Sequence, residues 1–262
     1  MSTIKGIKLF FLVFARSRKY VEKKIIELNG LKIPYVIICG ERMNHERVFY
    51  RTPIGKYDAI NFGAKLIPKD VDIVVMNDVD TNIHNFHAAL QQFKDQNTDI
   101  LFATEMVREG PQSLFFHLFN PIRRRIPLAA SGELMMIKHE IFEKLLPLKP
   151  CKAEDTYILF KALEFGYNVV FCEDCFAETE RTKTIEGEEA YKRRTVAGIY
   201  QALSYTNPPF IIRLLYTLLP ILSLLLIILG NRGYFMMRGI ILGFIDYLRG
   251  DRSGVWKTDY TL

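Results

Sequence analysis

Two aspartates one residue apart, Asp78 and Asp80, follow the apolar run 72–76 (DIVVM). The run has the β-branched composition of a buried strand, so both carboxylates are expected at its carboxyl end, where open α/β sheets bind ligands. Two carboxylates there can converge on one Mg²⁺ or Mn²⁺ ion, which can bridge the phosphates of a nucleotide diphosphate. An Asp-x-Asp triplet is also common on solvated loops, and the strand before it is what favours a metal site.

A second acidic pair, Glu154 and Asp155, stands at the start of a helix predicted over residues 155–165. Acidic residues at a helix N-terminus often only interact favourably with the helix dipole. The functional alternative is a carboxylate that removes the proton of an acceptor hydroxyl while the oxygen attacks a sugar.

A basic cluster, Lys192-Arg193-Arg194, is predicted at the start of a helix over residues 190–205. Cations are unfavourable at that end of a helix dipole, so another partner is expected. A diphosphate and an anionic lipid are the two candidates.

Alternating apolar strands and helices must position these residues. Strands are predicted over residues 7–14, 35–39, 72–76, 99–103, 134–137 and 169–172, and helices over 20–28, 58–66, 85–93, 140–145, 155–165 and 190–205. Gly30 is expected to end the first helix. The alternation predicts an α/β fold with a mostly parallel sheet and helices on both faces. Because Arg16 and Arg18 follow the first apolar run, we interpret it as a strand and not a signal peptide.

Composition narrows the partners of this 262-residue chain. Its net charge of +6 favours anionic partners such as acidic lipid and nucleotide diphosphates. No stretch interleaves basic and aromatic residues as a nucleic-acid platform does, so nucleic acid is not expected. Cys172 and Cys175 form one CxxC without a second pair at zinc-ribbon spacing, and Cys39 and Cys151 stand alone. The cysteines are therefore expected to be reduced thiols in a cytosol-facing compartment, and not ligands of a structural zinc ion.

The C-terminal part is the most apolar. Residues 211–229 carry a single charge, Arg213, and are long enough to cross a bilayer core. A buried core helix is the alternative. A second apolar stretch, 234–248, is followed by several cations. If the first helix crossed the membrane alone, these cations would lie on the outer side, against the tendency of basic residues to stay inside, so a hairpin or re-entrant pair is predicted. The expected domains are residues 1–207, catalytic, and 208–262, a membrane-anchoring hairpin. Residues 113–125 (SLFFHLFNPIRRR) are a second interfacial candidate, or a solvated loop.

Over about residues 7–205 these features resemble the membrane-bound family 2 glycosyltransferases, which have the GT-A fold. The resemblance rests on segments in the family's order: GKYDAINFG (55–63), DIVV with DVDT (72–75, 78–81), SGE before LMMIK (131–138), AEDTYIL (153–159) and KRRTVAG (192–198). Two positions depart from the pattern. Cys39-Gly40-Glu41 replaces the usual acidic residue after the second strand. Thr195 replaces a tryptophan that lines the family's acceptor site, which weakens a polymer-synthase role.

The resemblance implies a metal-dependent, inverting hexosyltransferase at the cell membrane, with its catalytic domain facing the cytoplasm. Asp78 and Asp80 would hold Mn²⁺ or Mg²⁺, Asp155 would be the catalytic base, and Arg194 would stabilise the leaving diphosphate. The implied donor-binding residues are Glu41, Lys56, Asp58, Asn61, Asp78, Lys192 and Arg193. The implied acceptor-side residues are Ser131, Gly132, Glu133 and Glu154. The donor would be a nucleotide-diphosphate sugar and the acceptor a polyprenyl phosphate or a glycolipid. Oligomeric state is left open.

Two other classes remain in view. One is a non-catalytic, membrane-tethered module with a GT-A-like fold. The other is a sugar-phosphate nucleotidyltransferase, which usually has a glycine-rich phosphate loop after the first strand. Here that turn reads Ala15-Arg16-Ser17-Arg18, without glycine.

Overall fold

The computed structural model describes residues 3–4, 6–107, 120–123, 125–130, 132–180, 184–251 and 253–254. The strands are β1 (Thr3–Ile4), β2 (Ile7–Ala15), β3 (Tyr35–Cys39), β4 (Val48–Tyr50), β5 (Ile73–Asp78), β6 (Asn82–His84), β7 (Ile100–Val107), β8 (Leu134–Lys138) and β9 (Val169–Thr179). The helices are α1 (Val21–Leu31), α2 (Lys56–Gly63), α3 (Phe86–Asp95), α5 (His139–Leu145), α6 (Glu154–Glu164), α7 (Ile185–Tyr205), α8 (Phe210–Leu222) and α9 (Gly230–Leu248). Short 3-10 helices are η1 (Arg18–Tyr20), η2 (Ala64–Leu66) and η3 (Ser223–Leu229).

Over the described residues the strands form one nine-stranded sheet in the order β4-β3-β2-β5-β8-β7-β9-β6, with β1 paired to β2. The half from β4 to β5 is parallel, whereas β8 runs antiparallel to both β5 and β7. The carboxyl ends of β2, β3 and β5 therefore meet at one edge. The register aligns Phe14 with Asp78 and Ala15 with Cys39 there.

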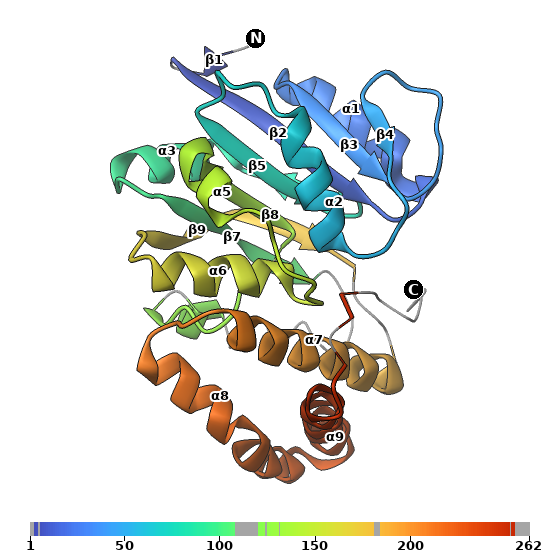
Figure 1. Ribbon diagram of the computed structural model, residues 1–262, viewed down its shortest axis with the longest axis vertical. Helices are drawn as coiled ribbons and strands as arrows, with labels where there is room; N and C mark the ends of the chain where they lie inside the picture. The colour runs from blue at the N-terminus through green and yellow to red at the C-terminus, as the bar shows by residue number, and fades with distance from the viewer. Residues whose placement is uncertain are drawn as a thin grey trace.

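Helices cover both faces of the sheet, as predicted (Figure 1). Leu12 and Phe14 of β2 pack on the side of α2, α5 and α6, and Phe11 and Val13 pack on the side of α1 and α3. A strand buried on both faces has no polar side to show, which explains the continuous apolar run at the N-terminus.

Two sequence-based expectations about helix ends are wrong. Helix α1 continues through Gly30 to Leu31, and Lys32 takes the left-handed conformation (φ 56°) after it. Helix α7 begins at Ile185, where the Thr184 side chain accepts a hydrogen bond from the Gly187 amide. The basic cluster therefore lies in the third turn of α7, where the argument from the helix dipole no longer applies.

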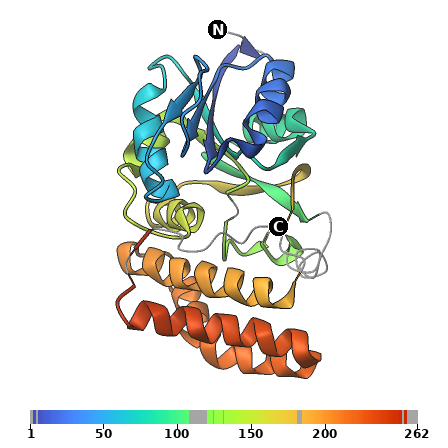
Figure 2. The same ribbon diagram turned by 90° about the vertical axis from the view of Figure 1, so that its right-hand side faces the viewer.

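Below the α/β part lies a layer of three helices, α7, α8 and α9 (Figures 1 and 2). Close packing of α9 on α7 depends on Gly239 and Gly243, because a Cβ at either position would overlap the backbone oxygens of Glu189 and Arg193. Arg193 also pairs with Asp246 of α9, at 2.6 and 2.8 Å.

The chain reverses at Gly230 (φ 70°), so α8 and η3 form a hairpin with α9. Among the described residues, Phe210–Leu248 is the one helical stretch long and apolar enough to cross a membrane. In its most apolar part only 17% of the residues are buried. The outer face of α8 and η3 exposes large apolar side chains, among them Ile221, Leu225 and Ile228. The division at residues 207 and 208 and the anchoring role remain predictions.

Candidate active site

The Asp78-Val79-Asp80 turn opens into a cavity beyond the carboxyl ends of β2 and β3. Asp78 is the last residue of β5, and the amide of Val79 donates to the Phe14 carbonyl at 3.0 Å, which anchors the turn to β2. This sheet-edge cavity has a volume of about 330 Å³. Its lining includes both aspartates together with the basic residues Arg16 and Lys19.

A second cavity, of about 430 Å³, lies between the sheet and the three-helix layer; we call it the helix cavity. One part of its wall is charged: Lys56, Asp78, Glu133, Glu154, Asp155, Lys192 and Arg194. The other part is mainly apolar: Val196, Ile199, Leu215, Leu219, Leu222, Leu226, Met236 and Ile240. Lys56 and Asp78 line both cavities, so the two spaces meet at this pair.

Lys56 joins the two acidic motifs. Its Nζ lies 2.6 Å from Asp78 Oδ1 and 3.1 Å from Glu154 Oε1. Gly132 permits this approach, because a Cβ there would lie 2.8 Å from Lys56 Nζ and 3.6 Å from Asp155 Oδ2. Burial acts to lower the pKa of Lys56, but Asp78 and Glu154 outweigh it and raise that pKa. The lysine therefore stays protonated beside its carboxylates.

Two carboxyl groups of the site titrate near neutrality. Burial raises the pKa of Asp78 to about 7, with Lys56 opposing and Asp80 and Glu133 adding to the rise. Burial and the neighbouring Glu154 raise the pKa of Asp155 to about 7, although the Thr156 amide donates to Asp155 Oδ1 at 2.7 Å. A carboxylate with a pKa near the working pH is suited to accept a proton in a reaction.

Helix α7 presents its basic cluster in two directions. Lys192 and Arg194 face the helix cavity, and the Arg194 guanidinium lies 5.0 Å from the centre of the Tyr191 ring. Arg193 is exposed and pairs with Asp246 instead. Gly198, further along α7, lets the helix approach the start of α6, because a Cβ there would lie 2.6 Å from the Ala153 amide nitrogen.

No protein-family profile and no curated protein sequence matches this chain. Solved structures do match. The mannosyltransferase PcManGT from Pyrobaculum calidifontis, in complex with GDP-Man and Mn²⁺, has a TM-score of 0.69 at 15% identity, covering 92% of this chain and 87% of that one. GalNAc-T7 with UDP, GalNAc and Mn²⁺ has a TM-score of 0.51 at 12% identity, covering 95% and 57%. TarS from S. aureus has a TM-score of 0.50 at 16% identity, covering 75% and 42%. These structures are GT-A glycosyltransferases. The chain has the GT-A fold.

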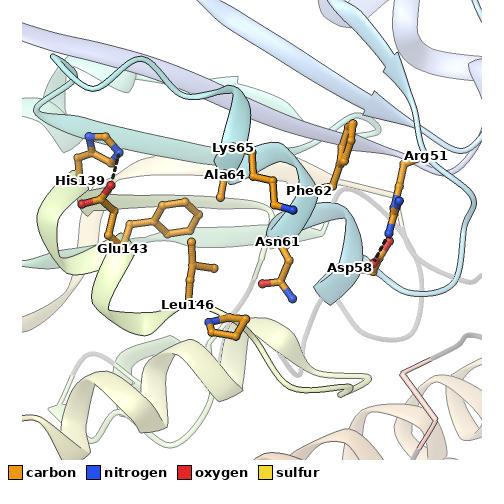
Figure 3. Close-up of a pocket in the computed structure, with 11 residues that line it drawn as sticks. Arg51, Asp58, Asn61, Phe62, Ala64, Lys65, His139, Glu143 and Leu146 are labelled. Carbon is orange, nitrogen blue, oxygen red and sulfur yellow. Dashed lines mark hydrogen bonds and ion pairs between the residues drawn. The ribbon is translucent and has the colours of Figure 1, made fainter.

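Three residues predicted to bind the donor do not line the sheet-edge cavity. Asp58 forms a two-point ion pair with Arg51 at 2.6 and 2.8 Å. The Asn61 amide bonds to the Leu148 backbone at 3.0 and 2.8 Å. Both line a third, open cavity of about 530 Å³ between α2 and α5 (Figure 3). Glu41 is half exposed and pairs with Arg18 at 3.1 Å. Donor contacts by these three residues remain predictions.

Two other expectations fall partly or wholly outside the described residues. Ser131 lies outside them, as do residues 113–119 and Arg124 of the proposed interfacial segment. Arg123 is described: it is 3% exposed, its Nε donates to the Ala129 carbonyl at 3.1 Å, and it lines the helix cavity.

The residues present fit a divalent cation that is bound partly by the protein and partly by a phosphate-containing ligand. In the described ranges no three His, Cys, Asp or Glu side chains gather as a complete metal site. Asp78 and Asp80 offer carboxylate oxygens on one turn, facing the sheet-edge cavity. Mg²⁺ and Mn²⁺ are commonly held in this way, by one or two carboxylates with phosphate and water as the other ligands.

Sequence reasoning missed a lysine beneath the turn. Lys24 of α1 is 1% exposed and donates hydrogen bonds to the segment around Asp78 and Asp80. A signal was present, because Lys24 stands three residues after Val21 and four before Leu28, both fully buried. A lysine at such a position on the apolar face of a helix indicates a buried polar partner.

Proposed function

We propose that this chain is a membrane-associated, inverting, metal-dependent family 2 glycosyltransferase. It would transfer a hexosyl group from a nucleotide-diphosphate sugar to a lipid-linked acceptor, either a polyprenyl phosphate or a glycolipid. The observation that carries the proposal is the meeting, at Lys56 and Asp78, of a cavity lined by both aspartates and basic residues with a largely apolar cavity. Donor and acceptor of such a reaction need adjoining sites of these two kinds.

The sheet-edge cavity is the proposed donor site. Its basic residues, Arg16 and Lys19, suit a diphosphate, and a cation held by Asp78 and Asp80 would neutralise the phosphate oxygens. PcManGT was solved with GDP-Man and Mn²⁺, and GalNAc-T7 with UDP, GalNAc and Mn²⁺, which supports a nucleotide sugar and a divalent cation here.

The helix cavity is the proposed acceptor site. Asp155 would accept the proton of an acceptor hydroxyl as its oxygen attacks the anomeric carbon and the bond to the diphosphate breaks. Lys56 and Arg194, which line this cavity, would stabilise the negative charge that develops on the departing diphosphate. A polyprenyl phosphate brings an ionised oxygen, so with that acceptor no proton has to be removed.

Membrane association is proposed from the hairpin. Exposed apolar side chains on α8 and η3 would contact lipid, and the same two helices supply Leu215, Leu219, Leu222 and Leu226 to the apolar wall of the helix cavity. All four cysteines are free and buried, which agrees with a catalytic domain that faces the reducing cytoplasm.

The test is product analysis with the full chain in detergent or vesicles. Nucleotide-diphosphate sugars are supplied with Mn²⁺ or Mg²⁺ and with a polyprenyl phosphate or a glycolipid. The proposal expects metal-dependent release of nucleoside diphosphate and glycosylated lipid, which Asp80→Asn abolishes. A parallel reaction with a nucleoside triphosphate and a sugar 1-phosphate tests the nucleotidyltransferase alternative, which would release pyrophosphate there. Donor binding without either product, across the panel, would identify a non-catalytic module.

A further inference from the structure

A buried lysine lies directly beneath the turn that carries Asp78 and Asp80. Lys24 Nζ is 2.7 Å from Glu27 Oε2, 2.8 Å from Asn77 Oδ1 and 2.5 Å from the Thr81 carbonyl oxygen. An ammonium has three N–H donors and no acceptor, so these three partners satisfy it completely.

The partners of Lys24 bracket the turn. Asn77 precedes Asp78 and Thr81 follows Asp80. The Asn77 amide donates to Thr81 Oγ1 at 2.8 Å, and Thr81 Oγ1 donates to the Asp78 carbonyl at 2.8 Å. The same Asn77 amide donates to the Glu133 carbonyl. The network therefore closes the turn on itself and links it to the strand after Gly132.

Glu27 completes the connection to α1. Its Oε2 pairs with Lys24, and its Oε1 accepts from the Ile83 amide at 2.8 Å. Helix α1 thus contacts the chain on both sides of the two aspartates. Because Lys24 and Glu27 have opposite charges, the pair adds little net charge beneath the turn.

We propose that Lys24 is a positioning residue that holds the Asn77–Thr81 turn in the conformation that presents Asp78 and Asp80 to one divalent cation. The inference rests on the proposed function. Removing the ammonium would leave the Asn77 and Thr81 oxygens buried without their donor, and the turn would have to rearrange to satisfy them. Loss of a positive charge would by itself strengthen cation binding. We expect the geometric effect to dominate, because Asp78 and Asp80 can bind one cation together only while the turn holds both carboxylates toward it.

The experiment measures Mn²⁺ binding by the full chain in detergent, with GDP or UDP present. Bound Mn²⁺ is quantified from the loss of the free-ion electron paramagnetic resonance signal. For Lys24→Met we expect the apparent Kd for Mn²⁺ to rise by about tenfold or more, as is usual when a residue that orients metal ligands is lost. Lys23→Met is the matched control, because Lys23 is the exposed neighbour on the same helix. It removes the same charge, and its Kd should stay within about twofold of wild type, an effect of the size expected for an exposed charge.

Lys24→Gln separates positioning from folding, because its amide retains hydrogen-bond donors for part of the network. Its Kd should lie between those of the wild type and Lys24→Met. An unchanged Kd in a folded Lys24→Met or Lys24→Gln protein overturns the inference, even where thermal stability falls. Failure of both variants to fold, beside a folded Lys23→Met, makes Lys24 purely structural and also overturns it. If the wild type binds no Mn²⁺ with either nucleotide, the proposed function fails first and the inference with it.

Discussion

Lys56 Nζ lies 2.6 Å from Asp78 Oδ1, so the carboxylate proposed to bind the cation is also the partner of a largely buried lysine. The same ammonium lies 3.1 Å from Glu154 Oε1. A cation that binds Asp78 would compete with Lys56 for that carboxylate, and the ammonium would then be freer to interact with the diphosphate. In the proposed mechanism Lys56 would therefore connect metal binding, the leaving group and the acidic pair at the start of α6.

Replacing Lys56 with Met should destabilise the protein in a pH-dependent way. Its loss leaves Asp78 and Glu154 without their cation, and removing one partner of a buried pair costs about 3–5 kcal/mol. Because Asp78 is 27% exposed and can bind a proton, we expect the free energy of unfolding to fall by less, roughly 1–3 kcal/mol at pH 7.5. Lys56 lowers the pKa of Asp78, so the variant's carboxyl pKa should rise further. The loss should shrink as the pH falls and the carboxyls become neutral. Urea unfolding at several pH values measures it, with Lys65→Met as control, and a pH-independent loss would contradict the assignment.

Asp155→Asn should lower kcat with a hydroxyl acceptor by on the order of 10²–10⁴, the usual contribution of a positioned general base. Donor affinity should change little, because the cation and diphosphate contacts remain. Glu154→Gln should reduce kcat much less, because Glu154 pairs with Lys56 and is not the proposed base. Turnover and calorimetric donor affinity check both variants. Near-normal turnover of Asp155→Asn on a glycolipid would remove Asp155 from the mechanism.

The pH profile should show the raised pKa of Asp155. Below about 7 the carboxyl is increasingly protonated and cannot accept a proton. With a hydroxyl acceptor, kcat/KM should therefore fall about tenfold per pH unit on the acid side. The residual activity of Asp155→Asn should lack this acid limb at saturating Mn²⁺. A flat wild-type profile between pH 5.5 and 8 would be inconsistent with a base of this kind.

Gly198→Ala should impair both stability and turnover. The added Cβ would lie 2.6 Å from the Ala153 amide nitrogen and push α7 away from the start of α6. We expect a loss of about 1–3 kcal/mol in unfolding free energy, as for other overpacked sites. Gly30→Ala is the matched control, since it is also helical and its Cβ would meet nothing within 4 Å. It should be neutral or stabilising by up to about 1 kcal/mol. Equal behaviour of the two variants would show that the α6–α7 approach is not tight.

Polar substitution of the outer hairpin face should weaken membrane binding without unfolding the chain. Ile221, Leu225 and Ile228 are 66%, 64% and 84% exposed, so replacing them together with Gln removes contacts to lipid and not to the core. At about 1.5–3 kcal/mol for each buried apolar side chain, liposome partitioning should fall at least about 100-fold. Ile26→Gln, at a 74% exposed site on α1, is the control. Unchanged co-sedimentation of the triple variant would place the membrane contact elsewhere.

The sequence predicted the central strands and the edge where the site lies, because strands buried on both faces have continuous apolar runs. The placement of Asp78 at the end of β5 and of Asp155 at the start of α6 followed from those local patterns. The contacts of Lys56 did not, since they depend on how α2, β5 and α6 come together in space. The same holds for Arg193, whose partner Asp246 is far away in sequence. The sequence predicts the start of helix α7 five residues too late, at 190 and not at Ile185. Its first turn, with Glu186 and Glu188, is polar and lacks apolar periodicity.

The shared wall formed by Lys56 and Asp78 has a kinetic consequence. Sites that adjoin through two side chains can be filled together, and a sugar can pass between them without an intermediate carried by the protein. The rate as a function of both substrate concentrations should then give intersecting lines in double-reciprocal plots, and not the parallel lines of a ping-pong enzyme. A nucleoside diphosphate that stays bound should in turn hinder the next donor while leaving the entry of lipid from the hairpin side open.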